Sequence, residues 1–279
     1  MTDRSLFPVI TGSGFFHAAD EKDTLLAEHG LVSPASLDEA LSAHFPKGSL
    51  RRVPLYARTG LYAAVSALSE AKRFPCPENT GIVVGSFFGC QKTSFDFMDS
   101  ILNDGPRLSS PLAFSHAVSN MAAGLLSLLL HTTGPAFTVN DQELSFAGAL
   151  EIGLSLLNSA RCDSVLVGAL DEADPRLHEV FPALPMASGS FFVCLERRSQ
   201  GIRAEVQWDV QNPSSLVLVH GPSGTLPLSP GVPQNSALAQ AFGCALALAH
   251  LKRDAVSADI SQKSTRVRRS ALIRLEKLS

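Results

Sequence analysis

The stretch GPAFTVNDQELSF, residues Gly134–Phe146, passes from a glycine-proline turn through a short apolar run and a polar turn into a helical pattern. Ala136–Val139 is typical of a strand, and Glu143–Ala160 carries apolar side chains at helical spacing. The apolar run Ser164–Gly168 follows and has the length of a buried strand. This part of the chain therefore predicts a strand, a helix and a second strand in succession.

Further strands and helices are predicted on both sides of this segment. The additional strand candidates are Pro8–Thr11, Gly81–Gly85, Ser190–Glu196, Leu216–His220 and Ser270–Leu275, and the additional helix candidates are Leu55–Arg73, Ser119–Leu130 and Ala237–Leu251. Short β-branched runs between longer helices indicate α/β layers around a largely parallel sheet. The nearly uniform apolar character of Ser119–Leu130 predicts a helix in the centre of the protein. Ser270–Leu275 alternates like a last edge strand, and Pro182–Ser190 is typical of a turn-rich break.

The composition excludes several classes of function. The 279 residues are 45% apolar and carry a net charge of −3 without a long run of Lys or Arg. We therefore expect a globular protein with a sizeable core that binds no nucleic acid. The longest apolar stretch, Ala122–Leu130, is too short to cross a bilayer. The N-terminus lacks the pattern of a signal peptide, which predicts a cytoplasmic protein.

Common catalytic and binding motifs are missing or incomplete. Thr11–Gly14 has two glycines of a dinucleotide motif but not the third, and no Gly-x-Ser-x-Gly motif occurs. No two histidines lie three or four residues apart, as a metal-binding helix pair would require. The five cysteines, an odd number without a Cys-x-x-Cys pair, are expected to be free thiols. We expect no bound metal or cofactor.

Several short motifs between residues 81 and 172 follow one another in a specific order. They are VGSFFG, GPRLSSP, SNMAAG, GPAFTV, CDSVLVGA and the acidic pair Asp171–Glu172. This succession resembles the N-terminal half of the β-ketoacyl synthases, which have the thiolase-like fold. The resemblance extends upstream to Val9–Gly12 and downstream to Gly189–Glu196. It implies an α/β protein with one layered α-β-α-β-α unit, in which residues 1–185 form the N-terminal half and residues 186–279 a shortened C-terminal half.

The same resemblance implies that the catalytic residues have been lost. In the family, a cysteine at the N-terminus of the helix after the GPAFTV strand takes the acyl chain, and Glu143 stands at that position here. His220 matches the first of the family's two catalytic histidines and is expected to be a structural remnant. The second position holds Ser236–Leu238, and neither the family's lysine nor its C-terminal glycine-rich loop has a counterpart. We expect no catalytic residue in this chain.

By resemblance, the chain is expected to be a chain length factor, similar to those of bacterial aryl polyene clusters. Such a subunit pairs with a cysteine-containing ketosynthase in a heterodimer and shapes the tunnel for an acyl chain, which an acyl carrier protein delivers on phosphopantetheine. The positions that match the tunnel and the dimer interface are Phe87, Phe88, Ala113, Phe114, Val118 and Glu143. The phenylalanines either form the floor of the tunnel or are ordinary core aromatics.

Two questions stay open at the level of the sequence. Glu143 either caps the helix that it begins or forms an ion pair with the partner subunit. The chain is either this non-catalytic subunit, a malonyl-carrier-protein decarboxylase, which would need both histidines, or an acyl-binding scaffold that forms a homodimer without chemistry.

Overall fold

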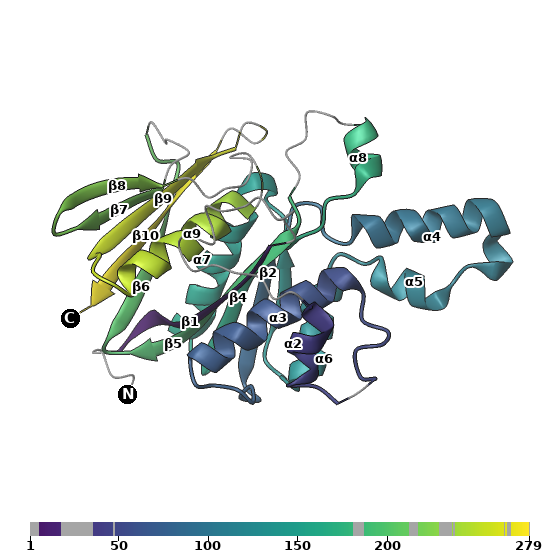
Figure 1. Cartoon of the computed structure of the whole chain (residues 1–279), viewed down its shortest axis with the longest axis horizontal. Coiled ribbons are helices and arrows are strands. Elements are labelled where there is room, and N and C mark those ends of the chain that lie inside the picture. The colour runs from purple at the N-terminus through teal and green to yellow at the C-terminus, as the bar shows by residue number, and fades with distance from the viewer. Residues whose placement is uncertain are drawn as a thin grey trace.

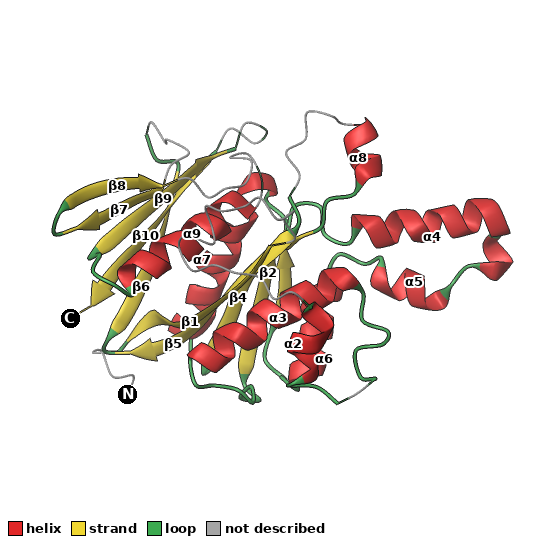
Figure 2. Cartoon of the chain, in the orientation of Figure 1, coloured by secondary structure: helices red, strands yellow, loops and turns green. Residues whose placement is uncertain are grey.

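The computed structural model describes residues 6–17, 36–46, 48–180, 187–211, 217–228, 236, 238–264, 266 and 269–278. In these residues ten strands form one sheet, in the order β3-β2-β4-β5-β1-β6-β10-β9-β7-β8, with helices packed against it (Figure 1, Figure 2). The strands are β1 (Phe7–His17), β2 (Thr80–Gly85), β3 (Ala136–Val139), β4 (Ser164–Asp171), β5 (Gly189–Arg198), β6 (Gly201–Trp208), β7 (Val217–Gly221), β8 (Gly224–Leu228), β9 (Ser257–Lys263) and β10 (Ser270–Leu278). The helices are α2 (Leu37–Ser42), α3 (Leu55–Glu70), α4 (Gln91–Asp104), α5 (Pro111–His116), α6 (Met121–Leu130), α7 (Ser145–Asn158), α8 (Pro175–Val180) and α9 (Leu238–Leu251), with short 3-10 turns η1 (Pro106–Leu108) and η2 (Gln142–Leu144).

The central strands β2, β4 and β5 are buried on both faces because their side chains alternate between two apolar cores. On β2, Val83 belongs to the core that contains α7 and α9, whereas Ile82 and Val84 belong to the core that contains α3 and α6. Figure 1 shows α3 and α6 on one face of this half of the sheet, and α7 and α9 between it and strands β6 to β10. Apolar layers on both faces explain the continuous apolar runs of these strands.

The other half of the sheet, β6-β10-β9-β7-β8, has one face against α7 and α9 and, among the described residues, an opposite face without a helix. Ala258 and Ile260 of β9 are buried, whereas Asp259 between them lies beside Arg274 of β10 on the opposite face. None of the helices that the structure describes packs on this charged face. Within the described residues the layers are therefore helix, sheet, helix and sheet, which confirms the α/β fold class; the fifth, helical layer of the expected α-β-α-β-α order is not among them, and the shortening of the C-terminal half stays a prediction.

The prediction of a largely parallel sheet was wrong. β2 pairs in parallel with β3 and β4, whereas the other strand pairs of the described residues are antiparallel. Ser270–Leu275, predicted as an edge strand, belongs to β10, which lies between β6 and β9. Burial on both faces produces the same apolar run in either strand direction, and one open face produces the same alternation inside a sheet as at its edge.

The boundary predicted between residues 185 and 186 lies outside the described residues, as does most of the break predicted at Pro182–Ser190. Leu216 and Ala237, the first residues of a predicted strand and a predicted helix, lie outside them too. β5 begins at Gly189 and pairs with β4 and β1. The strand just after the predicted boundary therefore belongs to the central, doubly buried part of the sheet.

Gly12 and Gly14 allow β1 to pack closely against α3. A Cβ atom at Gly12 would lie 2.1 Å from the carbonyl oxygen of Ala67, and one at Gly14 would lie 2.0 Å from that of Ala63. Contacts this short exclude any side chain. Helix packing thus accounts for the two glycines of Thr11–Gly14 without a nucleotide.

Helix α6 was predicted in the centre of the protein, but in the single chain it lies at the surface. Met121, Leu126 and Leu130 are buried, whereas Leu128 is 68% exposed. Neither α6 nor any other helix of the described residues is long and apolar enough to cross a membrane. The single chain therefore leaves an apolar side chain of this helix in contact with water.

Candidate functional site at the ends of the parallel strands

Three segments meet where the parallel strands β3, β2 and β4 end. Gly85 of β2 lies opposite Val139 of β3 and Ala169 of β4. The C-terminal ends of these strands therefore lie at one edge of the sheet, where open α/β sheets commonly bind ligands. The residues at this edge are Ser86–Gly89, Asn140–Glu143 and Asp171, the last residue of β4.

The carboxylate of Asp171 holds the loop after β2. Its Oδ1 accepts hydrogen bonds from Ser86 Oγ at 2.7 Å and from the backbone N–H groups of Phe87, Phe88 and Gly89 at 3.0, 2.9 and 3.2 Å. Burial raises the pKa of Asp171, although these hydrogen bonds act in the opposite direction. A buried acceptor with this many donors fixes the backbone that carries Phe87 and Phe88.

Side chains from α3 and from the loop after β3 also bind the loop after β2. The Tyr56 hydroxyl lies 3.2 Å from Ser86 Oγ, and Asn140 Nδ2 donates to the carbonyl oxygen of Phe87 at 2.8 Å. Burial, and after it the charge of Asp171, raises the pKa of Tyr56, so the phenol is neutral at physiological pH. The loops after β2 and β3 are therefore joined directly.

Glu143 lies in the sharp turn between β3 and α7. Gln142 before it has a φ of 52°, in the left-handed region that side chains disfavour. Glu143 is 1% exposed, and its Oε2 accepts a hydrogen bond from Ser264 Oγ at 2.6 Å. Its Oε1 lies 3.3 Å from Nε of Arg266. The carboxylate is therefore paired with the C-terminal part of the same chain.

This pairing bears on both predicted roles of Glu143. Within the described residues, its two oxygens are bound by Ser264 and Arg266 and not by N–H groups at the start of α7, so the helix-cap prediction was wrong. The guanidinium of Arg266 also lies over the ring of Phe87, 5.3 Å from its centroid. An ion pair with a partner subunit stays a prediction, and it would have to compete with Arg266.

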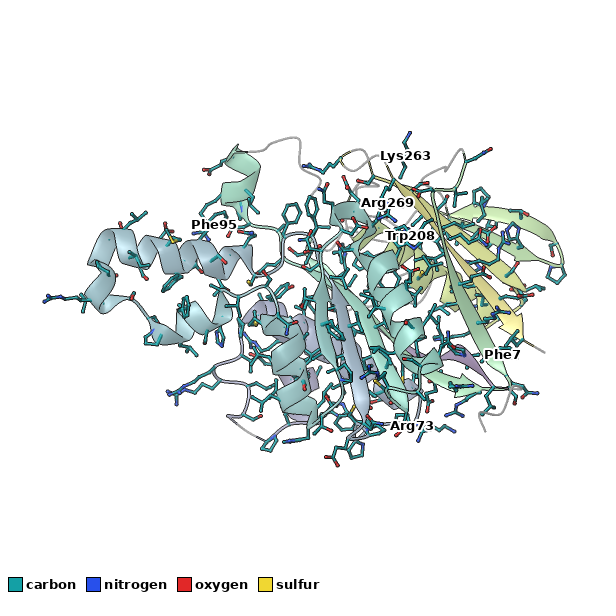
Figure 3. All side chains as sticks on the ribbon, turned by 180° about the vertical axis from the view of Figure 1, so that it is seen from behind. Phe7, Arg73, Phe95, Trp208, Lys263 and Arg269 are labelled. Atoms are coloured by element: carbon teal, nitrogen blue, oxygen red, sulfur yellow. The ribbon has the colours of Figure 1, made fainter. Side chains whose placement is uncertain are left out.

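A second arginine of the segment before β10 contacts the same turn. Arg269 Nη1 lies 3.7 Å from Oδ2 of Asp141, and its guanidinium lies 4.5 Å from the ring centroid of Trp208. Burial raises the pKa of Asp141, although the charge of Arg269 lowers it. Figure 3 shows Arg269 and Trp208 near each other below Lys263, with Arg73 at the opposite, lower edge of the view. Two cationic contacts thus hold this segment against the turn that contains Glu143.

All five cysteines are free thiols, and four of them are buried. Burial raises the pKa of Cys90, Cys162, Cys194 and Cys244, in the case of Cys194 to about 12. Burial likewise raises the pKa of Cys76. A thiol with a raised pKa is protonated at neutral pH and attacks carbonyl groups poorly.

His220 lies in the other half of the sheet. Its Nδ1 is 2.9 Å from Oγ1 of Thr225 across the β7–β8 hairpin, and its Nε2 is 3.9 Å from Oδ2 of Asp259 on β9. A cavity of about 300 Å³ beside this hairpin has His250 and Asp254 in its lining. His220 therefore contacts the hairpin and β9, and it is not part of the loops around Glu143.

Phe87 and Phe88 lie next to each other in the loop that Asp171 holds. Their rings stack with centroids 4.4 Å apart, and both side chains are partly exposed. Neither ring is fully buried in the single chain, so the choice between a core aromatic and a tunnel residue stays open for both. Their predicted place in an acyl tunnel stays a prediction.

Ala113, Phe114 and Val118 lie on a different part of the molecule. The helices α4, η1 and α5 belong to an arm, residues 91–118, that projects from the body (Figure 1), and none of their residues is buried. Phe114 is 59% exposed, so it is not a core aromatic. The predicted site residues thus fall into two groups, the loops around Glu143 and the arm.

The arm carries several exposed apolar side chains. Leu102 and Leu108 are 75% and 74% exposed, and Met98, Leu112, Phe114 and Val118 are exposed as well. Phe137 is exposed on β3, which forms one edge of the sheet. Groups of exposed apolar side chains commonly mark interaction surfaces, and an edge strand offers unpaired backbone groups to another chain.

The sequence offered little to identify four residues of the site: Tyr56, Asp171, Ser264 and Arg266. The only signal was the position of the acidic pair Asp171–Glu172 directly after a buried apolar run. Ser264 and Glu143 are 121 positions apart in the chain, so no local pattern connects them.

Comparison with known proteins places these observations in a family. The family of the β-ketoacyl synthase N-terminal domain matches residues 28–223, and no curated protein matches the sequence. Among solved structures, the ishigamide ketosynthase/chain length factor is 17% identical with a TM-score of 0.70, and 98% of this chain and 100% of that chain are covered. A ketosynthase (ApeO) in complex with its chain length factor (ApeC) from Xenorhabdus doucetiae is 15% identical with a TM-score of 0.64 and the same coverage. At such identities the likeness establishes a shared fold.

Proposed function

The chain belongs to the family of the β-ketoacyl synthase N-terminal domain, and from this membership we propose that it is a non-catalytic chain length factor. It pairs with a cysteine-containing ketosynthase and shapes the acyl tunnel during polyketide chain elongation, and within that class we propose an aryl polyene pathway. Two of the similar solved structures are described as containing a ketosynthase and a chain length factor, which supports the role of chain length factor.

The observation that carries the proposal is the chemistry at position 143. Where the resemblance expects a nucleophilic cysteine, Glu143 is buried and bound by Ser264 and Arg266. A carboxylate held by a cation offers no thiolate for a stable thioester, and the chain's cysteines are held protonated by burial. Chain transfer must then take place on another subunit.

The exposed apolar side chains support the need for that subunit. The arm presents Leu102, Leu108 and Phe114 to solvent, and β3 presents Phe137 at an open edge. A chain alone with these surfaces would tend to self-associate. We propose that the ketosynthase covers both surfaces in a heterodimer, the commonest assembly being a two-fold or pseudo-two-fold pair.

In the proposed complex, an acyl carrier protein delivers the acyl chain on phosphopantetheine, and this chain binds no cofactor of its own. Phe87 and Phe88 form part of the tunnel floor, because their loop is fixed by Asp171 and a filled apolar volume stops further growth. We place the complex in the cytoplasm, where such carrier proteins act.

The test is co-expression with the cysteine-containing ketosynthase encoded beside this chain, purification through a tag on one subunit, and light scattering. A 1:1 complex that elongates malonyl units, with no activity in either this chain alone or a complex whose ketosynthase cysteine is alanine, would support the proposal. A soluble homodimer that ignores the ketosynthase would instead favour an acyl-binding scaffold. Release of carbon dioxide from malonyl carrier protein by this chain alone would favour a decarboxylase.

The tunnel role of Phe88 has its own test. Phe88→Ala in the assembled complex should shift the products toward longer chains, because it removes a ring from the proposed floor. Phe7→Ala is the control, since Phe7 lies on β1, outside the loops around Glu143. An unchanged product distribution for Phe88→Ala would remove Phe88 as a determinant of chain length.

A further inference from the structure

Apolar burial fixes the direction of the long helices in the body, such as α3 and α7, but it does not fix the direction of the arm. No residue of α4, η1 or α5 is buried. At its base, Cys90 Sγ donates to the carbonyl oxygen of Val118 and Ser94 Oγ donates to that of Ala117, each at 3.4 Å. These bonds join the two ends of the arm to each other, so they leave its angle to the sheet to other contacts.

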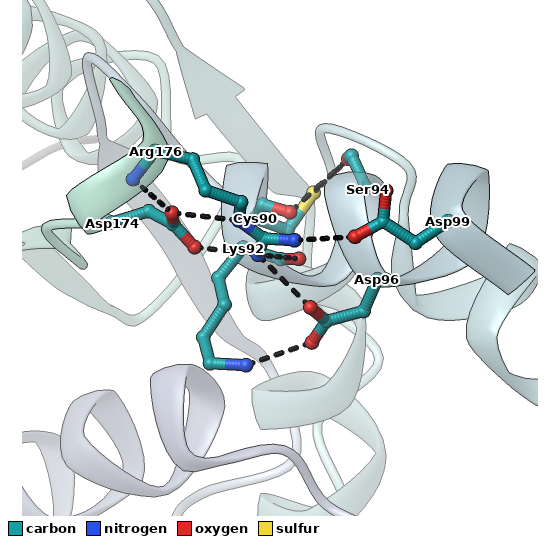
Figure 4. Close-up of polar contacts among 7 residues, drawn as sticks. All are labelled: Cys90, Lys92, Ser94, Asp96, Asp99, Asp174 and Arg176. Atoms are coloured by element: carbon teal, nitrogen blue, oxygen red, sulfur yellow. Dashed lines mark hydrogen bonds and ion pairs between the residues drawn. The ribbon is translucent and has the colours of Figure 1, made fainter. Parts of the chain in front are cut away.

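Arg176 of α8 makes contacts that join the body to helix α4 of the arm, as Figure 4 shows. Its Nη1 donates to Asp99 Oδ2 and its Nη2 to Asp96 Oδ1, both at 2.9 Å. Its Nη2 also donates to the carbonyl oxygen of Lys92 at 3.3 Å, and the guanidinium lies 4.9 Å from the ring centroid of Phe95. The four contacted residues lie three, one and three positions apart, which places them along one side of α4.

Asp174 holds the guanidinium from the side of the body. Its carboxylate binds Nε and Nη2 of Arg176 in a fork, at 2.9 and 2.7 Å, and it is buried (Figure 4). Hydrogen bonds from Arg176 lower the pKa of Asp174, so this carboxyl group is ionised at neutral pH. Because Asp174 follows closely after β4, Arg176 connects the arm to the end of a central strand.

We propose that Arg176 is a positioning residue that holds the arm at the angle at which its apolar side chains meet the partner subunit. The identity of that partner rests on the proposed function, whereas the connection between Arg176 and the arm is a property of this chain. Without Arg176, the carboxylates of Asp99 and Asp174 would lose their cation and Asp96 would keep only Lys92, 2.7 Å from its Oδ2, so repulsion between the carboxylates would turn the arm away from the body.

The partner then selects the fraction of molecules whose arm has the right direction. If that fraction falls to about 1–10% without Arg176, the apparent Kd for the partner rises about 10- to 100-fold. Folding of the body changes little, because no residue of the arm belongs to either apolar core.

The test compares Arg176→Ala, Arg176→Lys and the double variant Asp96→Asn/Asp99→Asn, with Arg274→Ala as the matched control. Arg274 forms a two-bond pair with Asp259 on the face of the sheet opposite α7 and α9, at 2.8 and 3.0 Å. The double variant removes the ionic contacts to α4 but leaves the buried Asp174 paired. It therefore separates the direction of the arm from the folding of α8.

Hydrogen exchange of the full chain measures the protection of α4 with α7 as the internal reference, and titration with the tagged ketosynthase subunit measures Kd. We expect faster exchange in α4 and about 10- to 100-fold weaker binding for Arg176→Ala. The double variant should change both quantities in the same direction but less, because it loses the ionic contacts without creating repulsion and keeps the contacts of Arg176 with Lys92 and Phe95. Arg176→Lys should fall between Arg176→Ala and the wild type, because an ammonium group cannot form the fork, and Arg274→Ala should change neither quantity.

The two proposals fail in different ways. Unchanged α4 exchange and unchanged Kd in Arg176→Ala and in the double variant would overturn the inference. A wild-type chain that binds no ketosynthase, but whose α4 exchange still depends on Arg176, would overturn the proposed function and confirm that Arg176 positions the arm.

Discussion

Helices α4 and α7 each contain 14 residues, and they are stabilised in opposite ways. α7 buries residues such as Phe146, Leu150 and Leu157 between the two halves of the sheet, whereas α4 buries none. α4 instead exposes Met98 and Leu102 and is tied to the body by the ionic contacts of Arg176. Apolar burial makes α7 the fixed support for the turn at Glu143, whereas α4 keeps its apolar side chains exposed.

The largest expected difference between α7 and α4 is the effect of a substitution in each helix on the free energy of unfolding. Phe146→Ala removes a buried ring that packs 5.7 Å from Phe191, centroid to centroid, and should lower the free energy of unfolding by about 3–5 kcal/mol. Leu102→Ala, on the exposed side of α4, should change it by less than about 0.5 kcal/mol. Urea denaturation of both variants measures this. Equal losses would show that the arm is part of the folding unit and would break the comparison.

The second effect should appear only in the complex. Replacing Leu102 and Leu108 together by Asp places two charges on the exposed apolar side of the arm and should weaken association with the ketosynthase by at least about 100-fold, or about 3 kcal/mol. The urea midpoint of the free chain should stay at its wild-type value. The control is Glu205→Lys, an exposed charge reversal on β6. If both variants bind like the wild type, the partner does not use the arm.

A smaller effect concerns the turn in front of α7. Glu143→Gln keeps a hydrogen-bond acceptor for Ser264 but removes the charge that faces Arg266, and it should lower the free energy of unfolding by about 1 kcal/mol. The loss is modest because Arg266 is partly exposed. A double-mutant cycle with Arg266→Gln isolates the coupling between the two side chains.

The same variant separates the two partners that were considered for Glu143. If Glu143→Gln retains full affinity for the ketosynthase, Glu143 is paired only within its own chain. A large loss of affinity without a loss of stability would instead assign the carboxylate to the interface.

The smallest effect is a pH dependence in the body. Burial acts to raise the pKa of Glu196, but hydrogen bonds from Arg73 and Arg198 lower it below its ordinary value of 4.5. A carboxyl group with a lowered pKa in the folded state contributes stability above its unfolded pKa, and this contribution is lost as the pH falls through the folded value. Glu196→Gln should therefore cost less than about 1 kcal/mol near pH 7, because both arginines are partly exposed.

Urea denaturation at two pH values checks this prediction. The difference between wild type and Glu196→Gln should shrink toward zero at a pH well below 4.5. A difference that grows toward acid pH would contradict the sign. Hydrogen exchange in α4 should show no dependence on Glu196 at any pH, since Glu196 lies on β5 and not at the base of the arm.

Local patterns predicted many of the individual elements. Ala136–Val139 was predicted with its observed bounds, and Gly81–Gly85 is one residue shorter than β2. The arm helices and strand β9 were not predicted, because α4 has an apolar side that faces water and β9, with the sequence SADISQK, has only two apolar residues. Both depend on neighbours that the local sequence does not specify.

The candidate site, too, could be predicted from the sequence only in part. The resemblance and the strand–turn–helix pattern were sufficient to single out Glu143 and the Phe87–Phe88 loop. They did not reveal that Asp171 holds that loop or that Arg266 pairs with Glu143, because these contacts cross from one strand end to another and from the C-terminal segment to α7.

The sequence by itself determined the family and the α/β class, because order of motifs and residue identity are properties of the chain. Only the tertiary structure decided strand direction, the position of β10 inside the sheet, the exposure of the arm and the partners of Glu143 and Arg176. The physical reason is that burial and ion pairing depend on which distant segments come together, and apolar runs and charged side chains look alike in sequence whether or not they find a neighbour.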